Sequence, residues 1–505
     1  MRPVWASSWT RTPSPGTAST RRNEPSMTAE PRTFIPTSAA PTGARIAGAG
    51  VDGDPHDLPD PATGETLATV GWVDPATAED AARAAHEALP GWGATPVRER
   101  AAALRAIAAD LRADTTAFAA VISAESGKRL SEATAEVGFS AQYLDWFADA
   151  ATMPRDEGVV TPQRRFAVTR RPVGVVAAVS PWNFPLSIPA RKVAPALAAG
   201  CTVVQKASEL TPLTSLAFTE ICERHLPAGA VNVVVGDGEK LTTALVDCEQ
   251  VAAVTFTGST AVGASVAARA MRSMTRVTME LGGKGPFIVT DHADLDVALE
   301  ALLVAKFRNN GASCIAANNV FVHQAVYDEF VAALRSRIES LVCGAPSDHA
   351  VDVGPMLRPA HVERLERLVA EAEATGCAVS RAPLTTTRGF FVAPTLVEAS
   401  AELRLWHEEI FGPVCAVRPY TSEDDIVTEI NEWRSGLGGY VMSADAEHAA
   451  QLAGRLEIGI VGVNNGAPNT PEVPFGGFGR AGLGREGGLS GLLEFTEEQT
   501  VSFAR

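Results

Sequence analysis

The sequence predicts an α/β protein that contains a parallel sheet with helices on both of its faces. Two observations support this fold class. Short runs rich in Val, Ala and Thr alternate with helical patterns through the middle of the chain. In addition, 46% of the 505 residues are apolar, which is enough for full-sized cores and excludes global disorder. We expect strands at 174–179, 201–205, 231–235, 252–257 and 276–279, separated by helices near 187–199, 213–225, 239–247 and 261–272.

The flanking segments predict further elements and a second α/β region. Residues 60–65 have the composition of a turn between two short strands. Residues 158–171 resemble a hairpin, and residues 492–503 a final strand that could pair with it as an interaction arm. The second α/β region runs from about 284 to 475. We expect the remaining helices near 77–89, 97–113, 115–127, 131–150, 293–308, 325–341, 359–374 and 446–456.

The charge and the cysteine content exclude several classes of protein. The chain has 43 Lys and Arg against 59 Asp and Glu, a net charge of −16. This argues against a nucleic-acid-binding or anionic-membrane surface, which needs clustered positive charge. No run of 18 apolar residues occurs, so no membrane-spanning helix is expected. The seven cysteines are scattered, which is typical of a reducing cytosol, and we expect a cytoplasmic protein.

Residues 1–45 differ in composition from the rest of the chain. They are rich in Pro, Ser, Thr and Arg and lack a periodic apolar pattern, which predicts a disordered tail. Arg21 and Arg22 are followed by no apolar stretch, so a secretory signal is not indicated. There are two alternatives to a disordered tail: the segment is a transit peptide, or the protein truly starts at Met27.

Polar motifs follow the first two predicted strands. In Pro181-Trp182-Asn183-Phe184-Pro185, two prolines hold an amide side chain that could stabilise an oxyanion; the alternative is a plain turn. Lys206 and Glu209 follow the second strand. They suit a ribose diol, with Lys donating and Glu accepting hydrogen bonds, although a solvated charged loop is the commoner arrangement.

The fourth and fifth strands also end in candidate site residues. Gly258 permits a tight turn, and Ser259 would face an anion at the start of the next helix, which indicates a phosphate site. Glu280 closes an apolar strand and precedes two glycines. Burial there would raise its pKa, as a general base requires, although strand-end carboxylates are common.

Cys314 differs from the other six cysteines. They lie at or near apolar strands and helices, where a buried, inert thiol is expected. Cys314 lies in a turn of small residues that gives a substrate access to the sulfur. The nine histidines occur singly and form no cluster with the cysteines, so no metal site is expected.

Together these motifs resemble the aldehyde dehydrogenase superfamily. The resemblance extends from about residue 60 to 503 and includes Glu409-Ile410-Phe411-Gly412-Pro413 and Pro474-Phe475-Gly476-Gly477. It implies dimers or tetramers and an α/β fold of three parts. These are a Rossmann-like cofactor-binding domain of residues 46–154 and 173–282, a catalytic domain of residues 283–478, and a β oligomerisation arm of residues 155–172 and 479–505.

The resemblance also implies a role for each motif residue. Cys314 would be the nucleophile and Glu280 the base, while Asn183 and the backbone N–H of Cys314 would form the oxyanion hole. The cofactor would be NAD by preference, with NADP as the alternative. It would be bound by Lys206 and Glu209 at the adenine ribose, by Gly258, Ser259 and Trp182 at the pyrophosphate, and by Glu409 and Phe411 at the nicotinamide riboside.

Within the superfamily, the sequence is most similar to succinate-semialdehyde dehydrogenases. The matching residues are Arg191, Arg308 and the segment Gly482-Leu483-Gly484-Arg485-Glu486-Gly487, with Thr470 where that group often has Ser. The resemblance implies that both arginines grip the distal carboxylate of the substrate, for which a guanidinium fork is suited. Internal salt bridges are the alternative for the arginines. A glutarate-semialdehyde or broader aldehyde dehydrogenase, or a non-catalytic structural relative, are the alternatives for the protein.

Overall fold

The computed structural model describes residues 42–153, 157–384, 386 and 388–504. Residues 1–41 of the predicted tail, with Met27, lie outside the described residues. Assigning residues 42–45 to that tail was wrong. They belong to strand β1 (Thr42–Ile46), which pairs antiparallel with β2 (Ala49–Asp52) and with β9 of the main sheet. This pairing buries Ala44 and satisfies backbone groups, which composition alone does not reveal.

The predicted parallel sheet is confirmed. Its central strands lie in the order β11-β10-β7-β8-β9, and each neighbouring pair is parallel. The chain order therefore reverses between β7 and β10, a position where open α/β sheets bind ligands. The antiparallel strand β19 (Gly482–Leu483) extends the sheet beside β11. The central strands are β7 (Val175–Val179), β8 (Thr202–Lys206), β9 (Val231–Val234), β10 (Val251–Gly258) and β11 (Arg276–Leu281).

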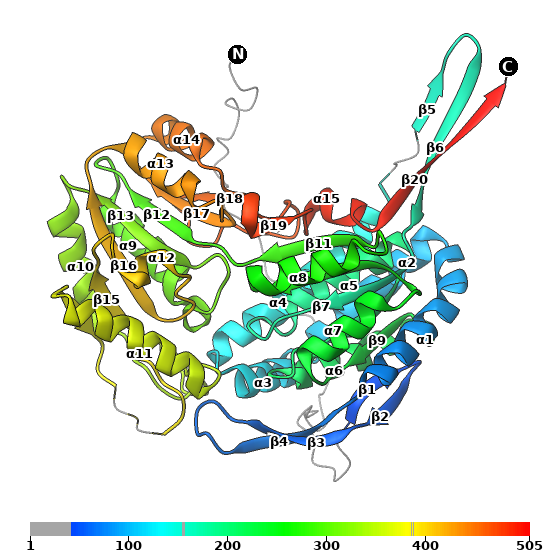
Figure 1. Cartoon of the computed structure of the whole chain (residues 1–505), viewed down its shortest axis with the longest axis horizontal. Coiled ribbons are helices and arrows are strands. Elements are labelled where there is room, and N and C mark those ends of the chain that lie inside the picture. The colour runs from blue at the N-terminus through cyan, green and yellow to red at the C-terminus, as the bar shows by residue number, and fades with distance from the viewer. Residues whose placement is uncertain (1–41, 154–156, 385, 387, 505) are drawn as a thin grey trace, which may run out of the picture. The chain divides into compact units, whose positions relative to one another are not determined.

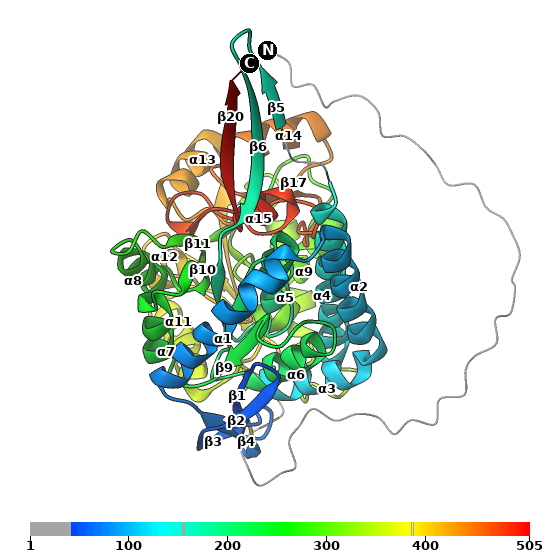
Figure 2. The same cartoon turned by 90° about the vertical axis from the view of Figure 1, so that its right-hand side faces the viewer.

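Helices cover both faces of this sheet (Figures 1 and 2). Consecutive residues of β7 face opposite sides, so that Val176 lies in one hydrophobic core and Val175 in the other. The first core contains α2 (Val97–Ala113), α3 (Thr115–Ser126), α4 (Leu130–Ala151), α5 (Ser187–Ala199) and α6 (Pro212–Glu223). The second contains α1 (Pro75–Ala94), α7 (Gly238–Asp247) and α8 (Thr260–Ala270).

A second, smaller sheet has the order β14-β15-β16-β13-β12-β17-β18 and is parallel except for β14. Its strands are β12 (Gly285–Val289), β13 (Ala317–His323), β14 (Val379–Arg381), β15 (Thr395–Glu398), β16 (Val414–Tyr420), β17 (Gly438–Met442) and β18 (Ile460–Val463). One face packs against α9 (Leu295–Phe307) and α10 (Tyr327–Glu339). The other packs against α11 (Pro359–Ala374), α12 (Arg404–His407), α13 (Glu423–Glu432) and α14 (Ala446–Arg455).

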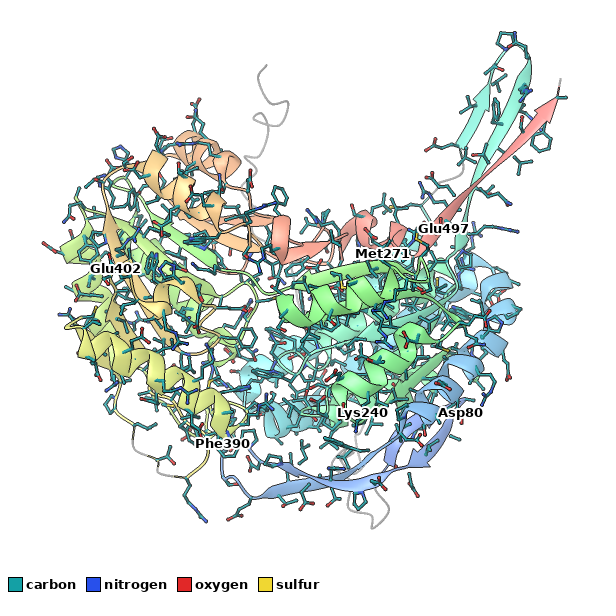
Figure 3. The ribbon with its side chains drawn as sticks, in the orientation of Figure 1. Asp80, Lys240, Met271, Phe390, Glu402 and Glu497 are labelled. Carbon is teal, nitrogen blue, oxygen red and sulfur yellow. The ribbon has the colours of Figure 1, made fainter. Side chains whose placement is uncertain are left out.

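The expected arm and the turn at 60–65 are both present. Strands β5 (Glu157–Val160), β6 (Arg164–Pro172) and β20 (Thr496–Ala504) form an antiparallel sheet in which β20 lies beside β6 (Figure 2). The turn joins β3 (Asp54–Pro59) to β4 (Thr66–Trp72). Glu497, labelled in Figure 3, pairs with Arg276 of β11 and ties the base of the arm to the main sheet.

The C-terminal end of the arm is shorter than the predicted 479–505. Residues 482–483 join the main sheet as β19, and α15 (Gly488–Leu493) packs against α4 and α5. Leu492 and Phe495 lie in the first hydrophobic core, so the last strand starts at Thr496 rather than at 492. Burial of these two side chains outweighs the strand-like composition of the segment.

Candidate active site

A cavity of about 1010 Å³ opens at the carboxyl edge of the main sheet. The strands β7, β8, β10 and β11 all end beside it, so that the motifs following them converge there. Ten residues that the sequence singled out line this cavity. They are Trp182, Asn183, Lys206, Glu209, Gly258, Ser259, Glu280, Cys314, Glu409 and Phe411.

Lys206 and Glu209 form an ion pair at one end of the cavity. The Lys206 Nζ lies 2.9 Å from Glu209 Oε2, and both groups approach Gly238 at the start of α7. The loop that carries them leads into α6, and the buried Glu125 carboxylate accepts hydrogen bonds from the backbone N–H groups of Leu213 and Thr214 there. These two hydrogen bonds at the helix N-terminus fix the loop so that a donor and an acceptor stand side by side.

Ser259 caps the helix that follows β10. Its hydroxyl accepts a hydrogen bond from the backbone N–H of Val262 at 3.4 Å, and α8 begins at the next residue. The remaining N–H groups of the first helical turn have no partner within the helix, and Ser259 and Ala261 line the cavity here, which suits an anion such as a phosphate. Gly263 packs against Leu281, where a side chain would collide with the neighbouring strand.

Glu409 has an unsatisfied oxygen in the wall of the cavity. Its Oε1 is buried without a hydrogen-bond partner, and its Oε2 lies close to Gly282, where a Cβ atom would approach to 2.5 Å. Burial raises the pKa of Glu409 to about 7. Arg364 holds this segment by donating to the carbonyl oxygens of Glu409, at 3.2 Å, and of Ile410. A buried acceptor without a partner is suited to a ligand hydroxyl such as that of a ribose.

Three of the ring side chains that line the cavity contact one another. The Trp182 ring stacks on His361 of α11, with centroids 5.0 Å apart, and meets the edge of the Phe411 ring at 5.5 Å. Burial lowers the pKa of His361 to about 4, helped by Arg358 and Arg364, so its imidazole is neutral at pH 7. The sequence analysis did not find His361. A single histidine on an amphipathic helix does not reveal that its side chain lines a cavity at the edge of the main sheet, since α11 packs against the second sheet.

Cys314 lies between a strained turn and the cavity. The single-turn helix η1 (Arg308–Gly311) precedes it, and Asn309 and Asn310 adopt left-handed backbone angles of φ 56° and 57°. Cys314 is half-buried and borders the cavity, and burial raises the pKa of its thiol to about 12. Arg191 lowers this pKa in part, while the carboxylates of Glu409 and Glu280 raise it further.

Asn183 is tied directly to the loop that carries Cys314. Its Nδ2 donates a hydrogen bond to the carbonyl oxygen of Ala312 at 3.0 Å. An amide nitrogen has two N–H groups, so the second is free to donate to a negatively charged oxygen formed beside the sulfur.

Glu280 is buried, and neither of its carboxylate oxygens has a hydrogen-bond partner. Burial raises its pKa well above the usual range, and the nearby Glu486 adds to this effect. Its Oε1 approaches Gly476, where a Cβ atom would come within 2.8 Å. A raised pKa and unsatisfied oxygens beside a thiol are the properties of a general base.

A buried cluster of charges lies behind Glu280. Glu486 accepts from Lys192 Nζ at 2.5 Å and lies 2.5 Å from Arg191 Nε, while Lys192 also donates to Thr255 Oγ1 at 2.9 Å. Burial alone would raise the pKa of Glu486, but Arg191 and Lys192 lower it, so it remains ionised. The sequence analysis noted the motif that contains Glu486 but gave this residue no role, because its partners are about 300 positions away.

The three residues predicted to bind substrate are not among those that line the cavity. Arg191 is buried, with Glu486 as its ion-pair partner and the Phe475 ring 4.2 Å away. Its internal salt bridge is the alternative that the sequence left open. Thr470 is exposed.

Arg308 differs from Arg191. It is half-buried, and within the described residues no carboxylate pairs with it. Its charge partly offsets the burial that raises the pKa of Tyr440, whose hydroxyl donates to the carbonyl of Ile315 at 2.5 Å. Arg308 therefore lies near the segment that follows Cys314 and has a charge free for an anion.

Residues 51–501 match the model of the aldehyde dehydrogenase family. The chain belongs to this family. The enzyme is 39% identical to the mitochondrial succinate-semialdehyde dehydrogenase of Oryza sativa, over 88% of this chain and 86% of that protein. It is 36% identical to a glutarate-semialdehyde dehydrogenase of Pseudomonas aeruginosa, over 90% of this chain and 96% of that protein.

Solved structures confirm the fold of this aldehyde dehydrogenase. The crystal structure of a succinate-semialdehyde dehydrogenase from Burkholderia pseudomallei matches with a TM-score of 0.90 and 36% identity. The match covers 92% of this chain and 98% of that one. The protein is therefore an oxidoreductase of the aldehyde dehydrogenase fold, its substrates are aldehydes, and the family uses NAD or NADP.

Two further features concern the described residues as a whole. No helix among them is both long and apolar enough to cross a membrane. Nor do they contain a group of three or more His, Cys, Asp and Glu side chains that could hold a metal ion.

Proposed function

We propose that this enzyme oxidises succinate semialdehyde to succinate, with NAD as the preferred cofactor and Cys314 as the nucleophile. The observation that carries the proposal is the convergence of three groups on one cavity. These are a thiol in a small-residue turn, an amide with a free N–H, and a buried carboxylate without hydrogen bonds, namely Cys314, Asn183 and Glu280.

Each of these groups has a step in the reaction. Cys314 Sγ attacks the aldehyde carbon after its thiol proton is lost to solvent water, and the raised pKa of the thiol makes this attack faster as the pH rises. The oxyanion accepts hydrogen bonds from Asn183 Nδ2 and the backbone N–H of Cys314. One such donor contributes about 100- to 1,000-fold to the rate. The bound cofactor supplies the hydride acceptor. Glu280 then deprotonates the water that hydrolyses the thioester on Cys314.

The cavity residues fit a dinucleotide. Lys206 and Glu209 pair a donor with an acceptor, as the two hydroxyls of the adenine ribose require. Ser259 and the start of α8 suit the pyrophosphate, next to the Trp182 ring. The buried Oε1 of Glu409 has no partner and would accept from a hydroxyl of the nicotinamide ribose, beside Phe411. A 2′-phosphate near Glu209 would meet a like charge, which favours NAD over NADP.

The proposed substrate rests on the free charge of Arg308 and on the relatives. Succinate semialdehyde and glutarate semialdehyde, named for the rice and Pseudomonas proteins, both carry a carboxylate far from the aldehyde. An unpaired, half-buried guanidinium near the cysteine loop suits such a group. We add Thr470 to the proposed carboxylate site. Arg191 pairs with the buried Glu486, so the proposal gives it a supporting role behind Cys314 and no contact with the carboxylate.

Location and assembly are part of the same proposal. All seven cysteines are free thiols, which supports a reducing cytosol. The strands β5 and β20 form the two edges of the arm sheet and expose the apolar residues Val159, Val160, Val501 and Phe503. Exposed strand edges pair readily with other chains, which supports a homodimer or homotetramer.

A panel of aldehydes tests the substrate. Reduction of NAD is followed by absorbance with succinate semialdehyde, glutarate semialdehyde and butanal at matched concentrations. We expect kcat/KM to be highest for succinate semialdehyde and lowest for butanal. A higher value for glutarate semialdehyde would move the assignment to the longer acid. Equal values for butanal and the two acids would show that no carboxylate is recognised.

A further inference from the structure

Two buried donors hold the backbone of Asn183 from behind. Lys128 Nζ donates to the carbonyl oxygen of Asn183 at 2.9 Å, and Asn309 Nδ2 donates to the same oxygen at 2.9 Å. Asn309 also donates to the carbonyl of Ala312 at 2.8 Å, the same oxygen that receives the Asn183 side chain. The peptide and the amide of Asn183 are thus fixed to the cysteine loop at several points.

Lys128 is itself fixed by its surroundings. Its side chain is 1% exposed and lies over the Phe184 ring at 4.3 Å. Its Nζ is 2.5 Å from Glu136 Oε2, while Glu136 Oε1 accepts from the backbone N–H groups of Leu186 and Ser187 at 3.0 and 3.1 Å. The pair therefore holds both sides of the turn at 181–187, Lys128 at Asn183 and Glu136 at the start of α5.

Residues on both sides of Lys128 support the cysteine loop as well. The carbonyl of Gly127 accepts from Asn310 Nδ2 at 3.0 Å, and Glu132 Oε2 accepts from the backbone N–H of Asn309 at 3.2 Å. Asn309 and Asn310 are the two residues of η1 with left-handed angles. The end of α3 and the start of α4 thus contact the oxyanion turn and the nucleophile turn together.

We propose that Lys128, paired with Glu136, is a positioning residue that aims the free N–H of Asn183 at the oxyanion. The physical reason is the narrow tolerance of such a site. A displacement of about 1 Å costs roughly 100-fold in rate, and a preorganised donor needs no rearrangement during the reaction. The pair is buried, so its charge-assisted hydrogen bond to the Asn183 carbonyl is not weakened by water. The inference rests on the proposed role of Asn183.

A double-mutant cycle tests it. The variant Lys128→Met/Glu136→Gln removes both buried charges together, which avoids leaving one of them unpaired. The Gln oxygen can still accept from Leu186 and Ser187. We expect the rate of the pre-steady-state NADH burst to fall about 10- to 100-fold. In an Asn183→Ala background, the same two changes should alter that rate by less than about 3-fold.

The control is an ion pair of similar geometry away from the cavity. Arg45 Nη2 lies 2.5 Å from Glu223 Oε2, and neither residue lines the cavity. Arg45→Met/Glu223→Gln should leave the burst rate within about 2-fold of wild type. NAD affinity, measured by protein fluorescence, should be unchanged in both double variants.

Three results would overturn the proposal. The first is an unchanged burst rate in Lys128→Met/Glu136→Gln, and the second is the same fold loss with and without Asn183. The third is an equal loss in the Arg45/Glu223 control. If Lys128→Met/Glu136→Gln does not fold, Glu136→Gln alone replaces it in the double-mutant cycle. We then expect the burst rate to fall about 3- to 10-fold, and we expect no such fall in the Asn183→Ala background. If the single change Asn183→Ala left the burst rate as in the wild type, the oxyanion role of Asn183 itself would be refuted.

Discussion

The cavity side of Cys314 and the side that holds Arg191 differ in how their charged groups are partnered. On the cavity side, oxygens of Glu280 and Glu409 are buried without hydrogen bonds. On the other side, Arg191 and Lys192 both form ion pairs with Glu486, and all three are buried. The contact of Arg191 Nε with Glu486 Oε2 lacks hydrogen-bond geometry, but it places opposite charges 2.5 Å apart. Buried groups without hydrogen bonds are costly, and a ligand or a reaction can use them, whereas charges that pair with one another offset part of the cost of their own burial. The comparison separates groups that act on ligands from groups that support them.

Arg308 differs from Arg191, since no carboxylate among the described residues pairs with it. The two arginines that looked equivalent in sequence are thus expected to behave differently. The following changes test this division, from the largest expected effect to the smallest.

Cys314→Ala should lower dehydrogenase activity by about 10⁴-fold or more, because no other group described at the cavity can form the covalent intermediate. The side chain borders the cavity, so the fold should survive. Steady-state NADH formation and the urea unfolding curve measure the two effects. Turnover close to wild type in a folded variant would refute the thiol mechanism.

Glu280→Gln should slow thioester hydrolysis by about 100- to 10,000-fold and spare the first NADH burst. In the wild type, the deacylation rate should rise with pH, because the raised pKa keeps Glu280 protonated and inactive as a base at lower pH. The variant should lose this rise. Stopped-flow traces across a pH series check both points. Loss of the burst itself would place Glu280 earlier, in removing the proton of Cys314.

Arg308→Gln should lower kcat/KM for succinate semialdehyde by about 10- to 150-fold, since a charge-assisted hydrogen bond contributes roughly 1.5–3 kcal/mol. Butanal has the same chain length but no carboxylate, and its turnover should change little. Arg308→Lys should recover only part of the loss, because an ammonium lacks the guanidinium fork. Equal losses for both aldehydes would mean that Arg308 supports the cysteine loop.

Glu209→Ser should shift the ratio of kcat/KM for NAD over NADP by about tenfold toward NADP. The change removes the charge that a 2′-phosphate would meet, while Lys206 remains to attract it. Initial rates with each cofactor at saturating aldehyde give the ratio. A ratio that does not move would place the adenine ribose away from Glu209.

Arg191→Met should change the preference for succinate semialdehyde over butanal by less than about 3-fold, the smallest effect. It should lower both activities together, because Arg191 depresses the pKa of Cys314. Breaking the buried pair with Glu486 should also cost about 3–5 kcal/mol in the free energy of unfolding. A selective loss with succinate semialdehyde would return Arg191 to the carboxylate site and end the distinction drawn from its ion pair.

Sequence by itself determined the main sheet and the residues at its edge. The alternation of Val-rich runs with helical patterns fixed β7–β11 within a few residues, and polar motifs at strand ends gave Asn183, Lys206 and Glu280. This succeeds because strand and helix periods are local, and parallel strands must place their carboxyl ends at one edge. The turn of small residues singled out Cys314, whereas its role as nucleophile and the choice of Glu409 came from the family resemblance. The cavity includes both residues.

Only the tertiary structure decided which charges are free and which are paired. Glu486 lies almost 300 positions from Arg191, and Lys128 is 55 positions from the carbonyl that it holds. No local pattern carries such pairings, because ion pairs between distant segments depend on packing. Packing likewise moved residues 492–495 from the arm into the core, and it left Arg308 without the carboxylate partner that Arg191 has.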